Sequence, residues 1–387
     1  MNPSDSLPVV KSLMLGFADR TGLLTSGREP RRYLWTDAFA VCNFIELYRQ
    51  TRKDSFLQLA VALIDQVHAT LGRHRQDDIR RGWISGLTGK DGLKHPTAGG
   101  LRIGKSLPER RQGEPQDERR EWDQDGQYFH YLTKWMHALH RTGEITGDMK
   151  YNRFALELAK TAHARFTYTP PSGGSKRMYW KMSIDLSRPQ VPSMGHHDPL
   201  DGLITYYELC VNLPAESSCP DLKTETDDLT TMCRNQDWTT DDPLGLGSLL
   251  IDACRLGQLI ASGAVSAQKL LEDIVSSFLK GLESYLRRNP LSLPASHRLA
   301  FREFGLSIGL RAAAKLKSVI TESPGCFNNM SVARHIEEIL RFDDLARSIE
   351  DFWLTPGNQR TGTWTEHRDI NDVMLATSLA PEEFLTI

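Results

Sequence analysis

Apolar residues recur along much of this chain at the three-to-four-residue spacing of an α-helix. From Trp35, the run WTDAFAVCNFIELYRQT places apolar side chains such as Phe39 and Ile45 near that spacing. After the polar break RKDS, the run FLQLAVALIDQVHATLG repeats the spacing. Two helical runs separated by a short polar break predict a helical hairpin.

The same layout recurs further along the chain. The runs YFHYLTKWMHALHRTGEITGD and YNRFALELAKTAHARF predict a second hairpin that turns at Gly147 and Asp148. Stretches with the alternating pattern of a strand are nearly absent. About five or six hairpins are expected, and such internal repetition predicts an all-α protein built as a closed or solenoid-like array. The remaining helices are expected to begin near Leu200, Leu222, Gly247, Ala267, His297, Val332 and Glu366.

Two long loops interrupt the helical pattern, and no change in composition marks a domain boundary. Residues 82–120 and 167–199 are rich in glycine, proline and charge, and both are too long to be routine connections. Disordered linkers are poor in aromatic residues, so Trp83, Tyr179 and Trp180 favour ordered loops that cover a site. Residues 1–387 are therefore expected to form one domain, in which residues 1–30 can be partly irregular.

Charge and cysteine content narrow the class of partner and the compartment. The 47 basic and 49 acidic residues leave a formal net charge of -2, which gives no basic field for nucleic acid or an anionic membrane. The six cysteines form no C-x-x-C pair and are expected to be reduced thiols. No N-terminal signal segment or membrane-spanning run is evident. We expect a soluble, cytoplasmic protein with a small polar partner and an oligomeric state that the sequence leaves open.

Several common catalytic signatures are missing from the sequence. It contains no G-x-S-x-G elbow, no Walker loop and no dinucleotide-binding glycine motif, so no cofactor is expected. His196 and His197 are adjacent, and neighbouring histidines at a helix start cannot easily reach one ion. No metal site is therefore expected.

The stretch REWDQDGQYFHYLTKW, Arg120 to Trp135, is the first candidate for a functional site. Capping explains Asp123 or Asp125 taken singly, because acidic side chains accept backbone N–H groups at a helix start. Capping does not explain the accompanying Trp122 and Tyr128. Aromatic faces stack on sugar rings and carboxylates bind hydroxyls or move protons, so the mixture predicts the wall of a pocket for a polar ligand.

Similar mixtures of aromatic, acidic and basic residues occur near other predicted helix starts. If the hairpins close into a barrel, these segments can gather at one end. The segment GTWTEHRDINDVML is the strongest of them, because it leaves Glu366 at the positive end of a helix dipole, where a carboxylate is easily kept ionised. The candidates for substrate binding are Trp35, Asp37, Arg81, Trp83, Trp122, Tyr128, Lys181 and Trp364, and the candidates for catalysis are Asp123, Asp125, His197, Asp198, Glu366 and His367.

The hairpins with their aromatic and acidic loops resemble the six-hairpin (α/α)6-barrel superfamily of inverting glycosidases, unsaturated glucuronyl hydrolases and N-acylglucosamine 2-epimerases. Two segments are locally similar to the epimerases: GHHDPLDGLITYYEL, where His197 opens a helix, and TWTEHRDINDVMLA, where His367 does so. The resemblance implies a single α/α-barrel domain whose inner helices carry a sugar-binding cleft at their loop-bearing ends.

Three functions remain open at this stage. The first is an inverting glycoside hydrolase acting on a small saccharide or glycoconjugate, with Asp125 or Asp198 as acid and Glu366 as base, roughly 6.5 to 9.5 Å apart. The second is a sugar epimerase, isomerase or cyclase that uses His197 and His367 to move protons. The third is a helical-repeat binding protein without chemistry.

Overall fold

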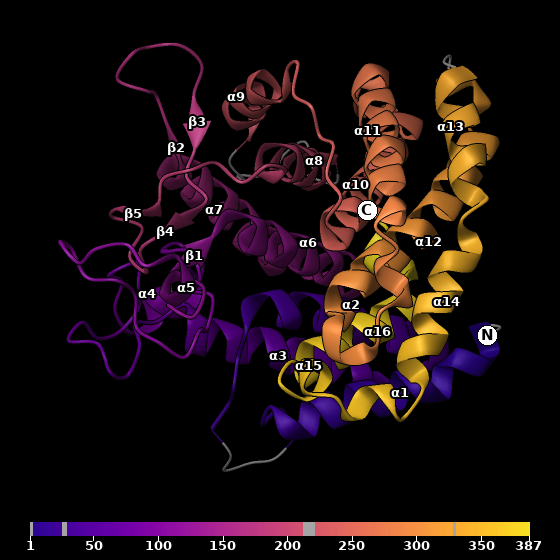
Figure 1. Cartoon of the computed structure of the whole chain (residues 1–387). Helices are drawn as coiled ribbons and strands as arrows, with labels where there is room; N and C mark the ends of the chain where they lie inside the picture. Colours follow the sequence, from indigo (N-terminus) through magenta and orange to yellow (C-terminus); the bar gives the residue numbers. More distant parts are fainter. Residues whose placement is uncertain (1–2, 25–28, 212–220, 328–329) are drawn as a thin grey trace. The chain divides into compact units, whose positions relative to one another are not determined.

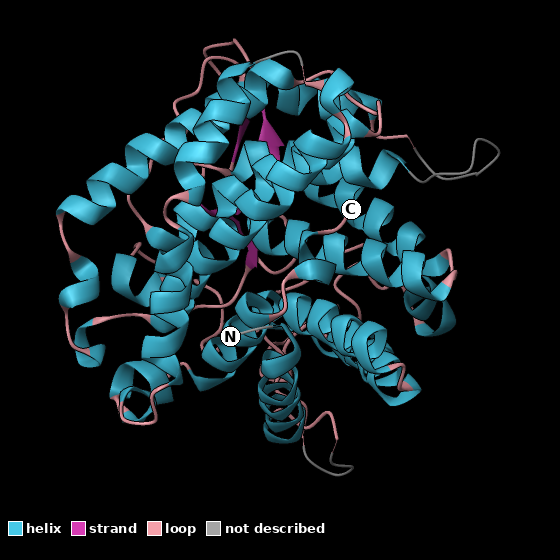
Figure 2. Ribbon diagram, turned by 90° about the vertical axis from the view of Figure 1, so that its right-hand side faces the viewer, coloured by secondary structure: helices cyan, strands magenta, loops and turns pink. Residues whose placement is uncertain are grey.

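The computed structural model describes residues 3–24, 29–211, 221–327 and 330–387. Helices make up most of the described chain and strands are few and short (Figures 1 and 2). The predicted all-α class is thus confirmed. The chain divides into two compact units, one formed by Ala18–Arg234 and the other by Met1–Phe17 together with Asn235–Ile387.

The unit Ala18–Arg234 is built from three helix pairs. Helix α2 (Leu34–Thr51) pairs with α3 (Asp54–Leu71), α6 (Phe129–Thr146) with α7 (Lys150–Phe166), and α8 (Asp198–Val211) with α9 (Lys223–Cys233). The first pair turns at Arg52, which has a left-handed φ of 56°. The second turns at Gly147, as predicted, where φ is 68° and glycine carries no Cβ penalty.

One helix of each pair is enclosed and the other is amphipathic. Residues of α2, α6 and α8 are buried around most of the helix circumference, whereas α3, α7 and α9 bury one face each. Helix α6 lies at the centre of this unit, because it packs against α2, α7 and α8. The loop-bearing N-terminal ends of these enclosed helices carry the site described below.

The two long loops are ordered, and the second one pairs with the residues that precede α6. Strand β1 (Gln127–Tyr128) pairs antiparallel with β4 (Lys181–Met182), which pairs with β5 (Pro189–Val191). Strands β2 (Thr167–Tyr168) and β3 (Arg177–Met178) form a separate pair, and short helices α4 (Gly89–Lys94) and α5 (Glu118–Glu121) lie in the first loop. The second loop is thereby held to the start of α6.

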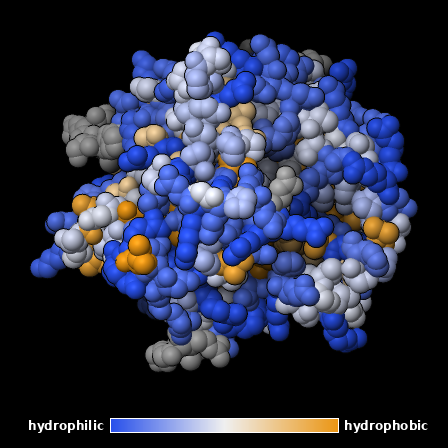
Figure 3. Space-filling view, turned by 60° about the vertical axis from the view of Figure 1, so that its left-hand side comes forward, coloured by the Kyte–Doolittle hydropathy of each residue, from blue (hydrophilic) through white to orange (hydrophobic). Residues whose placement is uncertain are grey.

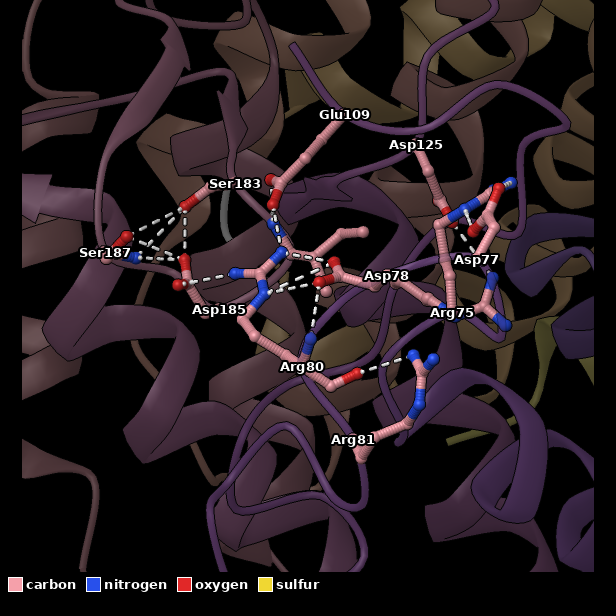
Figure 4. Close-up of polar contacts among 12 residues, drawn as sticks. Arg75, Asp77, Asp78, Arg80, Arg81, Glu109, Asp125, Ser183, Asp185 and Ser187 are labelled. Carbon is pink, nitrogen blue, oxygen red and sulfur yellow. Dashed lines mark hydrogen bonds and ion pairs between the residues drawn. The ribbon is translucent and has the colours of Figure 1, made fainter. Parts of the chain in front are cut away.

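A guanidinium group joins three separate loop segments. Arg80 forms ion pairs with Asp78 at 2.6 Å, Glu109 at 2.5 Å and Asp185 at 2.7 Å (Figure 4). The Asp185 carboxylate also accepts hydrogen bonds from its own loop, including the Ser183 hydroxyl at 2.8 Å. Such a network fixes loop geometry better than an isolated surface pair does.

The second unit contains the remaining helices. They are α1 (Pro3–Arg20, most of it), α10 (Pro243–Ala261), α11 (Gln268–Arg287), α12 (Ala300–Glu322), α13 (Met330–Leu340), α14 (Asp343–Leu354), α15 (Gly362–Thr365), α16 (Arg368–Leu379) and α17 (Glu382–Leu385), with 3-10 turns at Pro290–Ser292, Ala295–His297, Pro324–Cys326 and Asn358–Arg360. Helices α10 and α12 approach closely at Gly247, where an added Cβ would lie 1.8 Å from the Gly305 carbonyl oxygen. Among the described residues, α10 alone is long and apolar enough to cross a membrane, but 72% of its apolar window is buried inside the protein.

The predicted helix starts agree with the structure at α8 to α13 and at α16. Residues 3–20 form helix α1, with Pro8 inside it, a helix that the apolar pattern did not predict. Helix α14 was not predicted. Half of its residues are apolar, and Ala346, Ile349 and Trp353 bury one face of it.

Candidate active site

Seven ring-bearing side chains gather at the N-terminal ends of α2 and α6 and in the loops beside them. We call this group the aromatic cluster. All of it lies within the unit Ala18–Arg234, and each member contacts at least one other ring at a centroid distance of about 6 Å or less. Its members are Tyr33, Trp35, Trp122, Tyr128, His130, Tyr131 and Trp180.

The rings form a continuous row from the interior to the surface. Trp35 lies 5.3 Å from Tyr131, which lies 5.2 Å from Tyr128. Tyr128 lies 5.2 Å from Trp180, and Trp180 lies 5.3 Å from Trp122. Trp35 is buried, Trp180 is half-buried and Trp122 is 51% exposed. The row is therefore accessible at its Trp122 end.

Local contacts at the start of α2 fix one part of this row. The Asp37 carboxylate accepts the Tyr33 backbone N–H at 2.9 Å and pairs with the Arg32 guanidinium at 3.4 Å. An acidic side chain in this position caps the helix and holds the preceding residue extended. Tyr33 and Trp35 are thus presented on a rigid helix start.

One member of the aromatic cluster, a histidine, lies next to an aspartate. His130, in the first turn of α6, places Nδ1 3.3 Å from Oδ1 of Asp198, the first residue of α8. Asp198 is 5% exposed, and within the described part of the chain its Oδ2 has no hydrogen-bond partner; neither does His130 Nδ1. Buried polar atoms are normally paired, so these two atoms are unusual and make this residue pair a candidate for chemistry.

The Asp198 carboxylate is closely enclosed by its own loop. A Cβ on Gly195 would lie 2.4 to 2.6 Å from the three carboxyl atoms of Asp198. Any side chain at Gly195 would therefore push the carboxylate out of place. His197 lies in the same loop, half-buried, with its ring 4.6 Å from that of His196.

Two phenols and an ammonium group border the other side of the row. The hydroxyls of Tyr33 and Tyr131 are 2.7 Å apart, and Lys105 Nζ lies 5.5 Å from the centre of the Tyr33 ring. Burial raises the pKa of Tyr33 to about 12. Burial also lowers the pKa of Lys105, an effect that the nearby Asp123 carboxylate partly opposes. Both phenols are thus hydrogen-bonding groups, and Asp123 is a second carboxylate beside the cluster.

Further ion pairs continue along the interface of α6 and α8. Below His130 and Asp198, Lys134 Nζ lies 2.5 Å from Asp201 Oδ1, and Thr133 donates to Asp201 Oδ2 at 2.5 Å. One turn deeper, His137 Nδ1 lies 2.6 Å from Glu208 Oε1, and both side chains are fully buried. This ladder ties the two helices in one register and holds the site on a rigid support.

Asp125 occupies a different kind of position from the one expected of a catalytic acid. Its side chain is fully buried, and its two oxygens accept hydrogen bonds from the Arg102 guanidinium at 2.9 Å and from the backbone N–H groups of Gly104, Lys105 and Gly126. Arg75 adds an ion pair at 3.5 Å (Figure 4). These contacts anchor the loops, and they leave little of the carboxylate to meet a substrate.

Several predicted binding residues are also structural. The Lys181 ammonium is buried and donates to Glu121 Oε1 at 2.9 Å and to the carbonyls of Glu121 and Gln124. Asp37 is the buried cap described above. Tyr128 is buried as well, and burial raises its pKa above the ordinary value for a phenol. Of these, Tyr128 alone belongs to the aromatic cluster.

Two of the predicted tryptophan platforms have no open ring face. Trp83 is 5% exposed and is covered by the Arg73 guanidinium at 4.5 Å, and a Cβ on Gly92 would overlap it. Trp364 is 2% exposed and packs against Trp353 at 5.5 Å. Stacking on a sugar needs an accessible ring, so these indoles are core residues. Arg81, in contrast, is exposed and donates only to the carbonyl of its neighbour, Arg80, among the contacts described.

Glu366 and His367 lie in the other compact unit, at the junction of α15 and α16. Both are exposed, and the His367 ring lies 5.6 Å from Phe301. Of the predicted site residues, Trp35, Trp122 and Tyr128 belong to the aromatic cluster. Asp123 and Asp198 lie beside it.

Sequence reasoning did not single out three residues of this site. They are Tyr33, Lys105 and His130. Tyr33 and His130 stand at the starts of enclosed helices, where a polar aromatic residue next to an apolar run was a usable signal. Lys105 lies in a loop and carried no such signal. Among the described residues, no group of three histidine, cysteine or carboxylate side chains is arranged to hold a metal ion.

Comparison with known proteins identifies the fold. No protein-family model matches the chain, and no curated protein matches it. Among solved structures, an inactive variant of the α-1,6-mannanase GH76A of Salegentibacter sp. HEL1_6, in complex with α-1,6-mannotriose, is similar over 97% of this chain and 99% of that chain, with a TM-score of 0.52 and 12% identity. A sugar epimerase from a ruminal bacterium is similar over 98% of both chains, with a TM-score of 0.51 and 10% identity. The likeness confirms the predicted six-hairpin (α/α)6-barrel fold.

Proposed function

We propose that the protein is a carbohydrate-active enzyme, and that it hydrolyses a glycosidic bond in a small saccharide or glycoconjugate. The observation that carries this proposal is the buried Asp198, whose Oδ1 lies 3.3 Å from His130 Nδ1 in the aromatic cluster and whose Oδ2 has no hydrogen-bond partner among the described residues. A site with aromatic walls and a few convergent polar groups suits a sugar, which has apolar ring faces and polar hydroxyls. The solved mannanase and epimerase also act on sugars, which supports the same class.

The proposed hydrolysis uses two carboxylates, Asp198 and Asp123. Inverting hydrolysis needs one carboxyl group as acid and another as base, with room for a water molecule between the base and the sugar. Asp198 borders the aromatic cluster next to His130, and Asp123 borders it next to Lys105. Asp125 is left out of this assignment because its oxygens are occupied by loop contacts.

The linkage that is cleaved stays open in this proposal. The mannanase structure that binds mannotriose is an inactive variant in which two adjacent aspartates are replaced. At 12% identity the likeness shows the fold alone, so α-1,6-mannan specificity is not part of this proposal.

A second candidate reaction, sugar epimerisation, is favoured by the contact between His130 and Asp198. An imidazole nitrogen that lies 3.3 Å from a carboxylate oxygen is close enough to exchange a proton with it after a small movement. Epimerisation would use this pair and would not require Asp123. The two reactions can therefore be separated with one pair of variants.

The test compares Asp198→Asn, Asp123→Asn and the control Asp54→Asn, an exposed residue in the first turn of α3. Each protein is incubated with a panel of glycosides and oligosaccharides, and release of free sugar is measured. Hydrolysis predicts a fall in turnover of about 10² to 10⁴-fold for both site variants and none for the control. The pH–rate profiles then assign the roles. Loss of the base removes the fall in rate at low pH, and loss of the acid removes the fall in rate at high pH.

Three results would overturn parts of the proposal. Near-normal turnover of Asp198→Asn removes Asp198 from the chemistry. Deuterium incorporation into a sugar from heavy water, without release of free sugar and independent of Asp123, replaces hydrolysis with epimerisation. Sugar binding without any turnover of the unaltered protein leaves a binding protein.

A further inference from the structure

Trp122 is the most unusual residue on the surface of the unit Ala18–Arg234. The face of the molecule in Figure 3 is mostly hydrophilic, with small separate apolar patches. Ten large hydrophobic residues are exposed in the described chain, and Trp122 is the one aromatic residue among them. Single exposed leucines are common on protein surfaces. A half-exposed indole at the end of a row of aromatic rings is not, and it suggests a binding role.

The backbone on both sides of Trp122 is firmly held while its ring faces outward. The Lys181 ammonium donates to the carbonyl of Glu121 at 2.7 Å and to that of Gln124 at 2.8 Å, so it brackets Trp122 from inside. The Glu121 carboxylate is buried against Lys181 and against Arg110 at 3.2 Å. The indole is thus exposed but not free to move with its chain, which is the condition for a preorganised contact surface.

Trp180 completes this surface. Its ring lies 5.3 Å from that of Trp122 at an angle of 75°, so the two indoles form a corner. Trp180 in turn lies 5.2 Å from Tyr128, whose ring stacks on His130 at 5.3 Å. The corner is therefore connected to the proposed catalytic residues through one intervening ring.

We propose that Trp122 and Trp180 form a second saccharide subsite, so that the substrate is an oligosaccharide and not a single sugar with a small aglycone. This inference rests on the proposed function, because it extends the same site. One sugar unit would lie at His130 and Asp198, and a further unit would stack in the corner of the two indoles.

The test measures how catalytic efficiency depends on the number of sugar units. Neutral manno- and gluco-oligosaccharides of one to five units, including aryl glycosides of the single sugars, are assayed with the unaltered protein, Trp122→Ala and Trp122→Phe. The ratio of kcat/KM for a tetrasaccharide to that for the aryl monosaccharide should fall about tenfold in Trp122→Ala and recover in part in Trp122→Phe. Leu93→Ala, which alters another exposed apolar residue, should leave the ratio unchanged.

A binding arm keeps this inference separate from the proposed function. Oligosaccharide binding is measured by calorimetry on Asp198→Asn with and without Trp122→Ala, so that no turnover is needed. Binding that weakens about tenfold with Trp122→Ala supports the subsite even if no reaction is found. An unchanged affinity for every chain length, or an equal loss for one-unit and four-unit ligands, would overturn it.

Discussion

Replacing Asp125 with asparagine should destabilise the protein far more than it impairs chemistry. Asp125 Oδ1 accepts N–H groups from Gly104 at 2.9 Å, Gly126 at 3.1 Å and Lys105 at 3.3 Å, and Oδ2 pairs with Arg102 at 2.9 Å. Asparagine removes the charge and turns one oxygen into an NH2 donor. Whichever way the amide is oriented, that donor faces N–H groups, because both carboxylate oxygens are acceptors in the native contacts.

The size of the effect follows from what is left behind. Breaking one partner of a buried ion pair costs about 3 to 5 kcal/mol. Arg102 keeps carbonyl contacts to Thr70 at 3.0 Å and to Arg73 at 3.1 Å, and it is slightly exposed, so we expect the lower end, about 3 kcal/mol. For a unit of this size, such a loss lowers Tm by about 6 to 12 °C.

The assay pairs thermal unfolding with turnover on the same samples. Tm is read from near-ultraviolet circular dichroism, and turnover on the best saccharide is measured well below the lower Tm. The exposed Asp123 provides the control for stability, since Asp123→Asn should change the free energy of unfolding by no more than about 0.5 kcal/mol. A normal Tm for Asp125→Asn together with a turnover loss of orders of magnitude would refute the anchoring role and restore Asp125 as a chemical group.

Two further predictions concern His68 and Gly195. Burial lowers the pKa of His68 to about 3, and its Nε2 accepts the Trp135 indole N–H at 3.2 Å, so the unfolded chain takes up a proton below pH 6.5 that the folded state resists. The free energy of unfolding should therefore fall as the pH drops from 6.5 toward 3, by on the order of 2 kcal/mol at about pH 5. Urea unfolding of His68→Gln should lack this part of the loss. An unchanged pH dependence in that variant would contradict the prediction. Gly195→Ala would bring a Cβ to 2.4 Å from Asp198 Oδ2 and should lower turnover by about 10²-fold with little change in Tm, whereas normal turnover would show that the carboxylate position is not critical.

The sequence predicted the helices because their apolar spacing is a local property. The runs beginning at Trp35 and Tyr128 became the two expected hairpins, and the turn at Gly147 was recognisable from residue type alone. Helix α1 was not predicted, because Pro8 and Lys11 interrupt its apolar pattern. Local patterns do not report the contacts that an exposed face makes with distant segments.

The site was less predictable, because roles depend on partners that are distant in sequence. Trp35 and Trp83 look alike in sequence, since each is a tryptophan close to an arginine. Trp35 stands on a helix start among other rings, whereas Trp83 is covered by Arg73 and lies against Gly92. Loop packing decides between these outcomes, and loop packing has no periodic signature.

Asp125 and Asp198 show the same point for the carboxylates. Asp125 precedes an enclosed helix, Asp198 opens one, and both are buried. Sequence position and burial therefore do not distinguish a catalytic carboxylate from a structural one. The number of donors that reach each carboxylate separates them. Asp125 receives hydrogen bonds at both oxygens from rigid loop groups, whereas Asp198 has one oxygen near a half-buried imidazole and the other without a partner among the described residues. A buried carboxylate that the fold has satisfied holds the structure together, and one that the fold has left unsatisfied is suited to act on a ligand.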